Sequence, residues 1–286
     1  MSLLNQIFIN VRAVYRFIVF IGVLVIFFVR GIPIYIFTSD PILRRRRLAQ
    51  NCQMVSQMIM NAFNVELICR ENIPDSEYSL LVGNHIGFID IVCLASLRSA
   101  VFITSLEMKS TPVLGQIAEL GGCTYVNRKS RMSIQDELKD LVHVLKSGFR
   151  VVLYAESVAS NGEQVLPFKK TLMMSAGLAE RPIRPFVFNF VKINGRDVVY
   201  SLRDSVCWYG DQTFLPAIWR SLKLDSVTCE IEFLPLVHPK ASDDRTELAQ
   251  RIHAMVSARY IPFKPQMNLS STEESADLST SNTGLV

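Results

Sequence analysis

The stretch Asn84-His85-Ile86-Gly87-Phe88-Ile89-Asp90 places an aspartate five residues after a histidine. Five residues along a regular helix correspond to about 500°, so the two side chains would lie about 140° apart. On a strand they would point to opposite faces. They meet only if His85 lies on a turn, which Gly87 permits, and Asp90 lies in the first turn of the following helix. The spacing therefore predicts a strand–turn–helix unit that carries a histidine–aspartate pair.

Two interpretations fit this pair. In the first, Asp90 orients the imidazole of His85 and stabilises its charged form, as in a catalytic triad from which the protein nucleophile is missing. A substrate hydroxyl would then take the place of the serine. In the second, Asp90 only caps the amino end of a helix over Ile91–Leu97, and His85 is hydrogen-bonded in a loop. The spacing alone leaves both interpretations open.

From Asn64 onward, short apolar strands alternate with helical stretches. The predicted strands cover Val65–Cys69, Ser79–Val82, Val101–Ser105, Thr124–Val126, Val151–Tyr154, Arg184–Phe190, Asp197–Leu202 and Thr228–Leu234. The predicted helices cover Ile91–Leu97, Pro112–Glu119, Ser133–Lys146, Leu172–Glu180 and Arg245–Tyr260. Strands separated by helices are typical of a parallel sheet with helices packed on it. We therefore expect an α/β domain over residues 64–264, with a mostly parallel twisted sheet flanked by helices.

The N-terminal segment is strongly apolar. Phe17–Val29 is an unbroken apolar run with an arginine on each side. As a helix it covers about 20 Å, short of the ~30 Å hydrocarbon core of a bilayer. Gly31 and Pro33 follow it, and basic residues flank both ends, so both ends should remain in the cytosol. We expect residues 1–38 to form a membrane-embedded helical hairpin; a single span and a buried core helix are the alternatives.

Residues 39–63 are expected to form a basic amphipathic linker helix. Asp40-Pro41 is a favourable helix start, and Arg44–Arg47 follow within the next two turns. Its expected inward positions are Val55, Met58, Ile59 and Phe63. Residues 1–47 hold seven arginines and a single aspartate, which favours an anionic membrane surface over nucleic acid as a partner. The acidic, Ser- and Thr-rich residues 265–286 are expected to be disordered.

The cysteines and histidines indicate neither disulfides nor a metal site. The six cysteines are scattered without a C-x-x-C pair, which fits buried thiols in a reducing compartment. The four histidines form no cluster with metal-ligand spacing. We therefore expect no bound metal.

Three further segments follow the histidine in order. They are Gly122-Cys-Thr-Tyr-Val-Asn-Arg128, then Tyr154-Ala-Glu-Ser-Val-Ala-Ser-Asn-Gly162 with Leu166-Pro-Phe-Lys-Lys170, and finally Ile183-Arg-Pro185. Together with Asn84–Asp90 they resemble the four motif blocks of the glycerolipid acyltransferases, of which lysophosphatidic acid acyltransferase is typical. The resemblance covers about residues 60–240, and Trp208–Asp211 is similar to bacterial members.

The resemblance implies a role for each motif residue. His85 would act as general base on an acceptor hydroxyl and Asp90 would orient it. Arg128 would bind the acceptor's phosphate, Glu156 would belong to the acceptor-binding block, and Lys169 would extend the anion site. The acyl donor would be acyl-CoA or acyl carrier protein, with no other cofactor. Because no serine or cysteine stands beside His85, transfer would be direct, with backbone N–H groups after His85 stabilising the oxyanion.

One block departs from the family pattern. The family usually reads Pro-Glu-Gly-Thr where this chain has Ala155-Glu156-Ser157-Val158. The missing glycine adds a side chain beside the acceptor. The resemblance implies transfer to the sn-2 hydroxyl of lysophosphatidate, giving phosphatidate, at the cytosolic face of the cytoplasmic membrane. The alternatives are another lysolipid acceptor, such as a lyso-aminolipid, or a degenerate homologue that binds lipid without catalysis.

Overall fold

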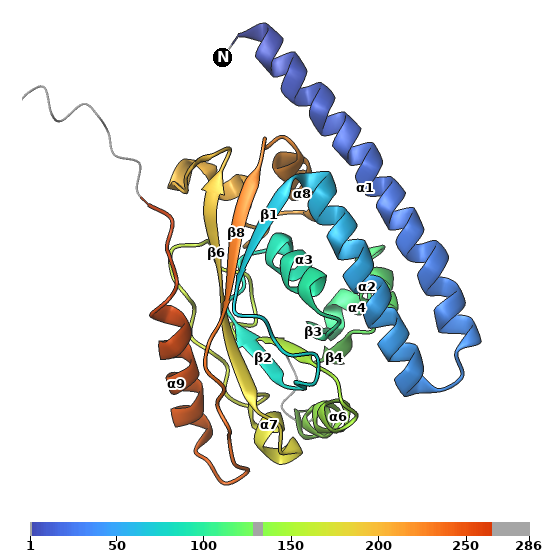
Figure 1. Cartoon of the computed structure of the whole chain (residues 1–286), viewed down its shortest axis with the longest axis vertical. Coiled ribbons are helices and arrows are strands. Elements are labelled where there is room, and N and C mark those ends of the chain that lie inside the picture. The colour runs from blue at the N-terminus through green and yellow to red at the C-terminus, as the bar shows by residue number, and fades with distance from the viewer. Residues whose placement is uncertain (1, 128–133, 265–286) are drawn as a thin grey trace, which may run out of the picture.

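A mixed sheet lies at the centre of the computed structural model, which describes residues 2–127 and 134–264 (Figure 1). Its strands are β1 (Val65–Arg70), β2 (Leu80–Gly83), β3 (Val101–Ser105), β4 (Thr124–Val126), β5 (Val151–Tyr154), β6 (Ile183–Ile193), β7 (Arg196–Asp197) and β8 (Val227–Phe233). The spatial order is β1-β8-β6-β2-β5-β3-β4, with β7 paired to β6. Only β6 with β8 and β6 with β7 are antiparallel among the described pairs. The predicted, mostly parallel α/β sheet is confirmed.

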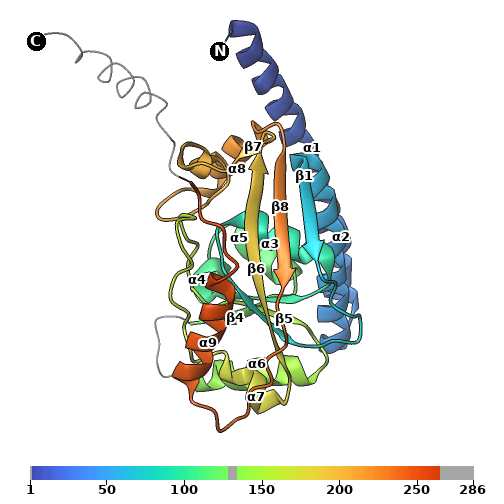
Figure 2. The ribbon, with the colours of Figure 1, turned by 60° about the vertical axis from the view of Figure 1, so that its left-hand side comes forward.

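Helices cover both faces of this sheet, because successive strand residues point to opposite sides. On β2, Leu81 packs into the core shared with α2 (Pro41–Phe63), α3 (Phe88–Leu97) and α8 (Phe214–Leu222). Leu80 packs on the other face, into the core with α6 (Ile134–Lys146), α7 (Met174–Ala179) and α9 (Arg245–Ser257). Figures 1 and 2 show these two helical layers on either side of the strands.

The N-terminal segment differs from the prediction. Residues Leu3–Phe37 form one uninterrupted helix, α1, so the hairpin expected within residues 1–38 is wrong. Gly31 is a packing position and not a break, since a Cβ there would lie 3.5 Å from the Leu120 Cβ of α5 (Leu114–Leu120). One turn earlier, Asn51 of α2 donates to the Phe27 carbonyl at 3.2 Å. Tertiary packing therefore keeps the helix continuous through Pro33.

Helix α2 runs back along α1 and lies between α1 and α3 (Figure 1). Its start was predicted correctly: the Asp40 carboxylate accepts a hydrogen bond from the Leu43 N–H at 2.6 Å. Val55 and Phe63 are buried, as expected, while Met58 and Ile59 are partly buried. The helical hairpin of this chain is thus made by α1 and α2 together.

Two other predictions need correction. The strand expected over Asp197–Leu202 is replaced by the two-residue β7 and a 3-10 helix, η1 (Tyr200–Ser205). The main chain there pairs with the C-terminal segment instead, since Tyr200 N–H donates to the Lys264 carbonyl at 3.0 Å. Helices α8 and α4 (Leu106–Lys109) were not predicted. Pro216 lies in the first turn of α8, where its missing N–H costs nothing.

Candidate active site

His85 lies in the loop between β2 and α3, and Asp90 is the third residue of α3. The Nδ1 atom of His85 lies 3.1 Å from both carboxylate oxygens of Asp90. The same carboxylate accepts hydrogen bonds from the Ile86 N–H at 2.5 Å and the Gly87 N–H at 2.9 Å. The predicted turn–helix geometry is confirmed. One carboxylate thus caps the helix start and contacts the imidazole, so the two interpretations of Asp90 are structurally compatible, and its catalytic role stays a prediction.

This geometry fixes the orientation of the imidazole. The side chain of Asp90 is fully buried, whereas that of His85 is 19% exposed. A buried carboxylate beside Nδ1 favours the tautomer in which Nδ1 carries the proton and its N–H donates a hydrogen bond to Asp90. The lone pair of Nε2 is then free to accept a proton from a substrate. The pair has the arrangement of a general base and its orienting carboxylate.

The ring of Tyr154 stacks on the imidazole of His85, with centroids 4.2 Å apart and planes inclined by 20°. Tyr154 ends β5 and pairs in register with Gly83, two residues before the histidine. Its hydroxyl is buried without a hydrogen-bond partner among the described residues. Burial, and then the charge of Asp90, raise the pKa of this hydroxyl well above its ordinary value. The spacing in the sequence gave no sign of this contact, which depends on strand register.

Glu156 lies beneath the same loop and is almost completely buried. One oxygen accepts from the His85 N–H at 3.0 Å and the other from the Leu166 N–H at 3.1 Å. Burial raises the pKa of Glu156 to about 8, although the two N–H donors act in the opposite direction. Both oxygens are thus occupied by the backbone. The carboxyl group holds the histidine loop against the segment that follows β5.

Further backbone contacts fix the loop on its other sides. The Asn84 amide donates to the Phe188 carbonyl at 2.9 Å and accepts from the Phe188 N–H at 2.8 Å, which ties the end of β2 to β6. The Trp208 N–H donates to the Ile86 carbonyl at 3.0 Å. Gly87 permits this approach, because a Cβ at that position would lie 2.9 Å from the Trp208 nitrogen. Asn84 is a positioning residue that stood within the quoted motif without a predicted role.

Two predicted site residues remain, Arg128 and Lys169. Arg128 lies outside the described residues. Strand β4 precedes it in the sequence and ends at Val126, at the same edge of the sheet as the carboxyl end of β2. Lys169 is exposed and makes no side-chain hydrogen bond to His85, Asp90 or Glu156. It lines a separate groove of about 460 Å³ between the segment after Glu156 and α9.

Ser157 occupies the position where the motif usually has glycine, and its φ angle is +68°. That left-handed conformation favours glycine and costs another residue roughly 1 kcal/mol. The loop therefore keeps a conformation suited to glycine while carrying a serine. The next residue, Val158, is 58% exposed. Two side chains thus replace glycine and threonine beside the site.

Comparisons with known proteins place these features in context. The profile of the family described as "Acyltransferase" matches residues 64–189. The chain is 31% identical over 186 residues to the lyso-ornithine lipid O-acyltransferase of Brucella abortus (strain 2308), covering 63% of this chain and 70% of that one. It is 27% identical over 179 residues to the 1-acyl-sn-glycerol-3-phosphate acyltransferase of Neisseria gonorrhoeae, covering 63% and 68% of the two chains.

The fold has a solved counterpart. The crystal structure of the 1-acyl-sn-glycerophosphate (LPA) acyltransferase of Thermotoga maritima superimposes with a TM-score of 0.63 over 89% of this chain and 95% of that one. The sequences of the two are 16% identical. At that identity, the similarity concerns the fold.

Proposed function

Because this chain belongs to the acyltransferase family, we propose that it transfers a fatty acyl chain from acyl-CoA or acyl carrier protein to a lysolipid hydroxyl. The observation that carries the proposal is the His85–Asp90 pair, with Nδ1 held by a buried carboxylate and Nε2 free. No serine or cysteine within residues 2–127 and 134–264 hydrogen-bonds to the His85 side chain. This supports direct transfer without an acyl-enzyme.

In the proposed mechanism, Nε2 of His85 removes the proton from the acceptor hydroxyl as its oxygen attacks the thioester carbonyl carbon. Asp90 stabilises the imidazolium that forms. When the tetrahedral intermediate collapses, the C–S bond breaks and the imidazolium returns its proton to the leaving thiolate. The products are the acylated lipid and a free thiol, and His85 regains its starting state.

The tetrahedral oxyanion needs hydrogen-bond donors. The N–H groups of Ile86 and Gly87 already donate to Asp90 and are therefore unsuitable. The next N–H groups belong to Phe88 and Ile89 in the first turn of α3, where a helix leaves its N–H groups without internal partners. We assign the oxyanion to this turn.

Two acceptors remain to be separated. Lysophosphatidate, acylated at its sn-2 hydroxyl, is the acceptor that the four motif blocks and the Neisseria relative support. A lyso-ornithine lipid is the second candidate, favoured by the Brucella relative and by the replacement of the motif's glycine and threonine by Ser157 and Val158. If lysophosphatidate is the acceptor, Arg128 would hold its phosphate. If a lyso-ornithine lipid is the acceptor, Arg128 would contribute less to acceptor binding.

We also propose that the enzyme lies on the cytosolic membrane surface, with α1 in the plane of the interface. By length and composition α1 is the single described helix that could cross a membrane. Its outward face is apolar along about 50 Å, with exposed side chains such as Ile7, Ile18, Val29 and Ile36. However, contacts hold it to the body near both ends: Arg12 pairs with Asp225, and Tyr35 donates to Glu119.

These contacts argue against a span. A crossing α1 would draw its neighbour α2, with four consecutive arginines, into the hydrocarbon. An in-plane helix buries the apolar stripe at the boundary between head groups and acyl chains and leaves the arginines at head-group level. The acceptor and product would then reach the site from the same leaflet.

The test is an acyl-transfer assay with purified enzyme, labelled acyl-CoA or acyl carrier protein, and a panel of lysolipids analysed by mass spectrometry. Lysophosphatidate as preferred acceptor, with an apparent affinity lowered by Arg128→Ala, supports the first candidate. Preference for lyso-ornithine lipid supports the second. Absence of transfer to any lysolipid would refute the proposed activity.

A further inference from the structure

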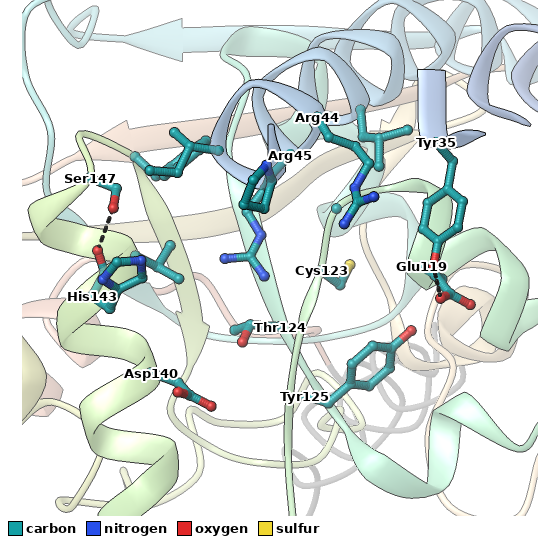
Figure 3. A pocket seen from close by; sticks show the side chains of 16 residues that line it. Tyr35, Arg44, Arg45, Glu119, Cys123, Thr124, Tyr125, Asp140, His143 and Ser147 are labelled. Atoms are coloured by element: carbon teal, nitrogen blue, oxygen red, sulfur yellow. Dashed lines mark hydrogen bonds between the residues drawn. The ribbon is translucent and has the colours of Figure 1, made fainter. Parts of the chain in front are cut away.

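A polar cavity lies at the opposite edge of the sheet from His85. His85 follows the carboxyl end of β2, whereas this cavity opens beside Thr124, at the amino end of the parallel strand β4. It has a volume of about 440 Å³ and is enclosed by the end of α1, the start of α2 and the last two turns of α6 (Figure 3). Gly122, at φ +74°, lets the chain pass α2 closely: a Cβ there would lie 3.2 Å from the Arg45 carbonyl oxygen.

Arg45 is one of the two arginines that line this cavity. Figure 3 shows its guanidinium extending from α2 toward Thr124. It forms neither a side-chain hydrogen bond nor an ion pair with any residue of 2–127 and 134–264. Burial lowers its pKa, while the nearby carboxylate of Asp140 acts in the opposite direction. A partly buried guanidinium without a partner keeps its hydrogen-bond donors available to a ligand.

The other arginines of the same run are placed differently. Arg44 stacks over the ring of Tyr35 at 5.1 Å, at the rim of the cavity. Arg46 is exposed and lies over the ring of Phe149, and Arg47 donates to the Thr38 hydroxyl at 3.3 Å. Arg46 is not among the residues that line the cavity. Neighbouring residues with the same charge thus differ in their access to it.

The cavity also presents a carboxylate. Asp140 of α6 lies below Arg45 in Figure 3, and its side chain makes no hydrogen bond or ion pair with a described residue. The second acidic residue, Glu119, accepts a hydrogen bond from the Tyr35 hydroxyl at 2.9 Å. Arg45 and Asp140 are close enough to interact electrostatically but form no ion pair with each other. Of the charged side chains that line the cavity, Arg44 and Glu119 both contact Tyr35, whereas Arg45 and Asp140 have no hydrogen-bond or ion-pair partner among the described residues.

We propose that this cavity binds the zwitterionic head group of a membrane phospholipid, with the phosphate on Arg45 and the ammonium on Asp140. A purely anionic ligand would leave Asp140 unpaired and repelled, whereas a phosphoethanolamine group satisfies both side chains. The placement also fits: Ile42 and Leu43, at the start of α2, are exposed apolar residues, and Ile42 lines the cavity. The inference depends on the membrane placement proposed above and concerns a site separate from His85.

The first test is titration of the purified protein with two soluble probes, glycerophosphoethanolamine and glycerol phosphate, by calorimetry. Wild type should bind glycerophosphoethanolamine more tightly. Arg45→Gln should weaken its binding at least about tenfold, the cost of one charge-assisted contact, and the matched control Arg46→Gln less than about twofold. Equal losses in the two variants would refute a defined site, because bulk charge alone would then explain binding.

The Asp140→Asn variant tests the contact between Asp140 and the ammonium group, because the affinities for the two probes should change in opposite directions. It should weaken glycerophosphoethanolamine binding several-fold and strengthen glycerol phosphate binding, since it removes a repulsion. Stronger binding of both probes would show a plain anion site and overturn the proposal. Circular dichroism melts of each variant establish that folding is intact.

A flotation assay distinguishes a lipid from a free metabolite. The vesicles contain phosphatidylethanolamine in place of part of the phosphatidylcholine. They should retain a larger fraction of the wild-type protein than of the Arg45→Gln variant. The Arg46→Gln variant should be retained to the same extent as wild type. If the soluble probe binds but vesicle retention is the same for all three proteins, the cavity takes a free phosphoamine and the lipid assignment is wrong. Neither measurement requires acyl transfer, so failure here is distinguishable from failure of the proposed activity.

Discussion

The two polar regions at opposite edges of the sheet differ in how their hydrogen bonds are used. Around His85, the carboxyl groups of Asp90 and Glu156 have protein partners on both oxygens. In the cavity beneath the α1–α2 turn, Arg45 and Asp140 have none among the described residues. The hydrogen bonds around His85 are made within the protein, whereas Arg45 and Asp140 keep their hydrogen-bonding groups available to a ligand.

The two regions therefore suit different functions. A satisfied network holds one geometry before substrate arrives, which general-base chemistry requires. An unsatisfied pair of charges gains most of its stabilisation only when a ligand supplies partners. Tyr154 is the exception at the His85 edge, since its buried hydroxyl has no partner among the described residues. Substitutions should therefore act on rate at one edge and on binding at the other.

The largest expected effect is that of His85→Ala. Removing the general base should reduce turnover by about two orders of magnitude or more, with little change in melting temperature, because the side chain is partly exposed and Asp90 keeps its backbone donors. Steady-state kinetics and thermal unfolding on one preparation measure both. Near-normal turnover of the His85→Ala variant would refute the proposed mechanism.

Glu156→Gln should come next, because it acts through the loop that holds His85. An amide presents one acceptor oxygen, so one of the two backbone N–H groups would face an NH₂ group and lose its hydrogen bond. We expect turnover to fall roughly tenfold and the melting temperature to fall as well. A loss of turnover without any loss of stability would instead indicate direct contact of Glu156 with the acceptor.

The same carboxyl group predicts a pH dependence of stability. The pKa of Glu156 is about 8 in the folded protein, above its ordinary value of 4.5, so unfolding releases a proton between these values. Its stabilising contribution is complete below pH 4.5 and is lost as the pH rises through 8. The melting temperature of wild type, measured against that of the Glu156→Gln variant at the same pH, should therefore fall between pH 5 and pH 8. A constant difference between the two proteins would show that Glu156 is ionised in both states.

Tyr154 should give a smaller effect that separates its ring from its hydroxyl. Tyr154→Phe keeps the stacked ring and removes an unpaired buried hydroxyl, so activity should remain within about twofold of wild type. Tyr154→Leu should reduce turnover several-fold because the imidazole loses its flat support. An equal loss of turnover in the two variants would show that the hydroxyl group, and not the stacked ring, supports His85.

The smallest effect on turnover is expected for charges on the outward face of α1. Ile18→Glu with Val29→Glu should lower the membrane-bound fraction markedly, since each places a charge where apolar side chains meet lipid. Turnover on a water-soluble short-chain substrate should be unchanged, because both positions face away from the body. Unchanged membrane binding would contradict the in-plane placement.

The sequence determined the features that depend on local spacing. The five-residue separation of His85 and Asp90 required a turn followed by a helix start, and that is the geometry found. Short apolar runs between helical stretches located β3, β4 and β5 at their observed bounds. Asp40-Pro41 marked the beginning of α2. In each case, neighbours in the chain supply the deciding interactions.

Tertiary structure decided the rest, because the partners are far apart in the chain. Tyr154 reaches His85 only through the register of β5 on β2, and Glu156 engages the histidine loop only because those strands are adjacent. Helix α1 continues through Gly31 and Pro33 because α2 and α5 pack against it. Arg45 differs from Arg46 only by the side of α2 that faces the cavity. A run of identical arginines is one pattern in the sequence, and folding assigns its members to separate surroundings.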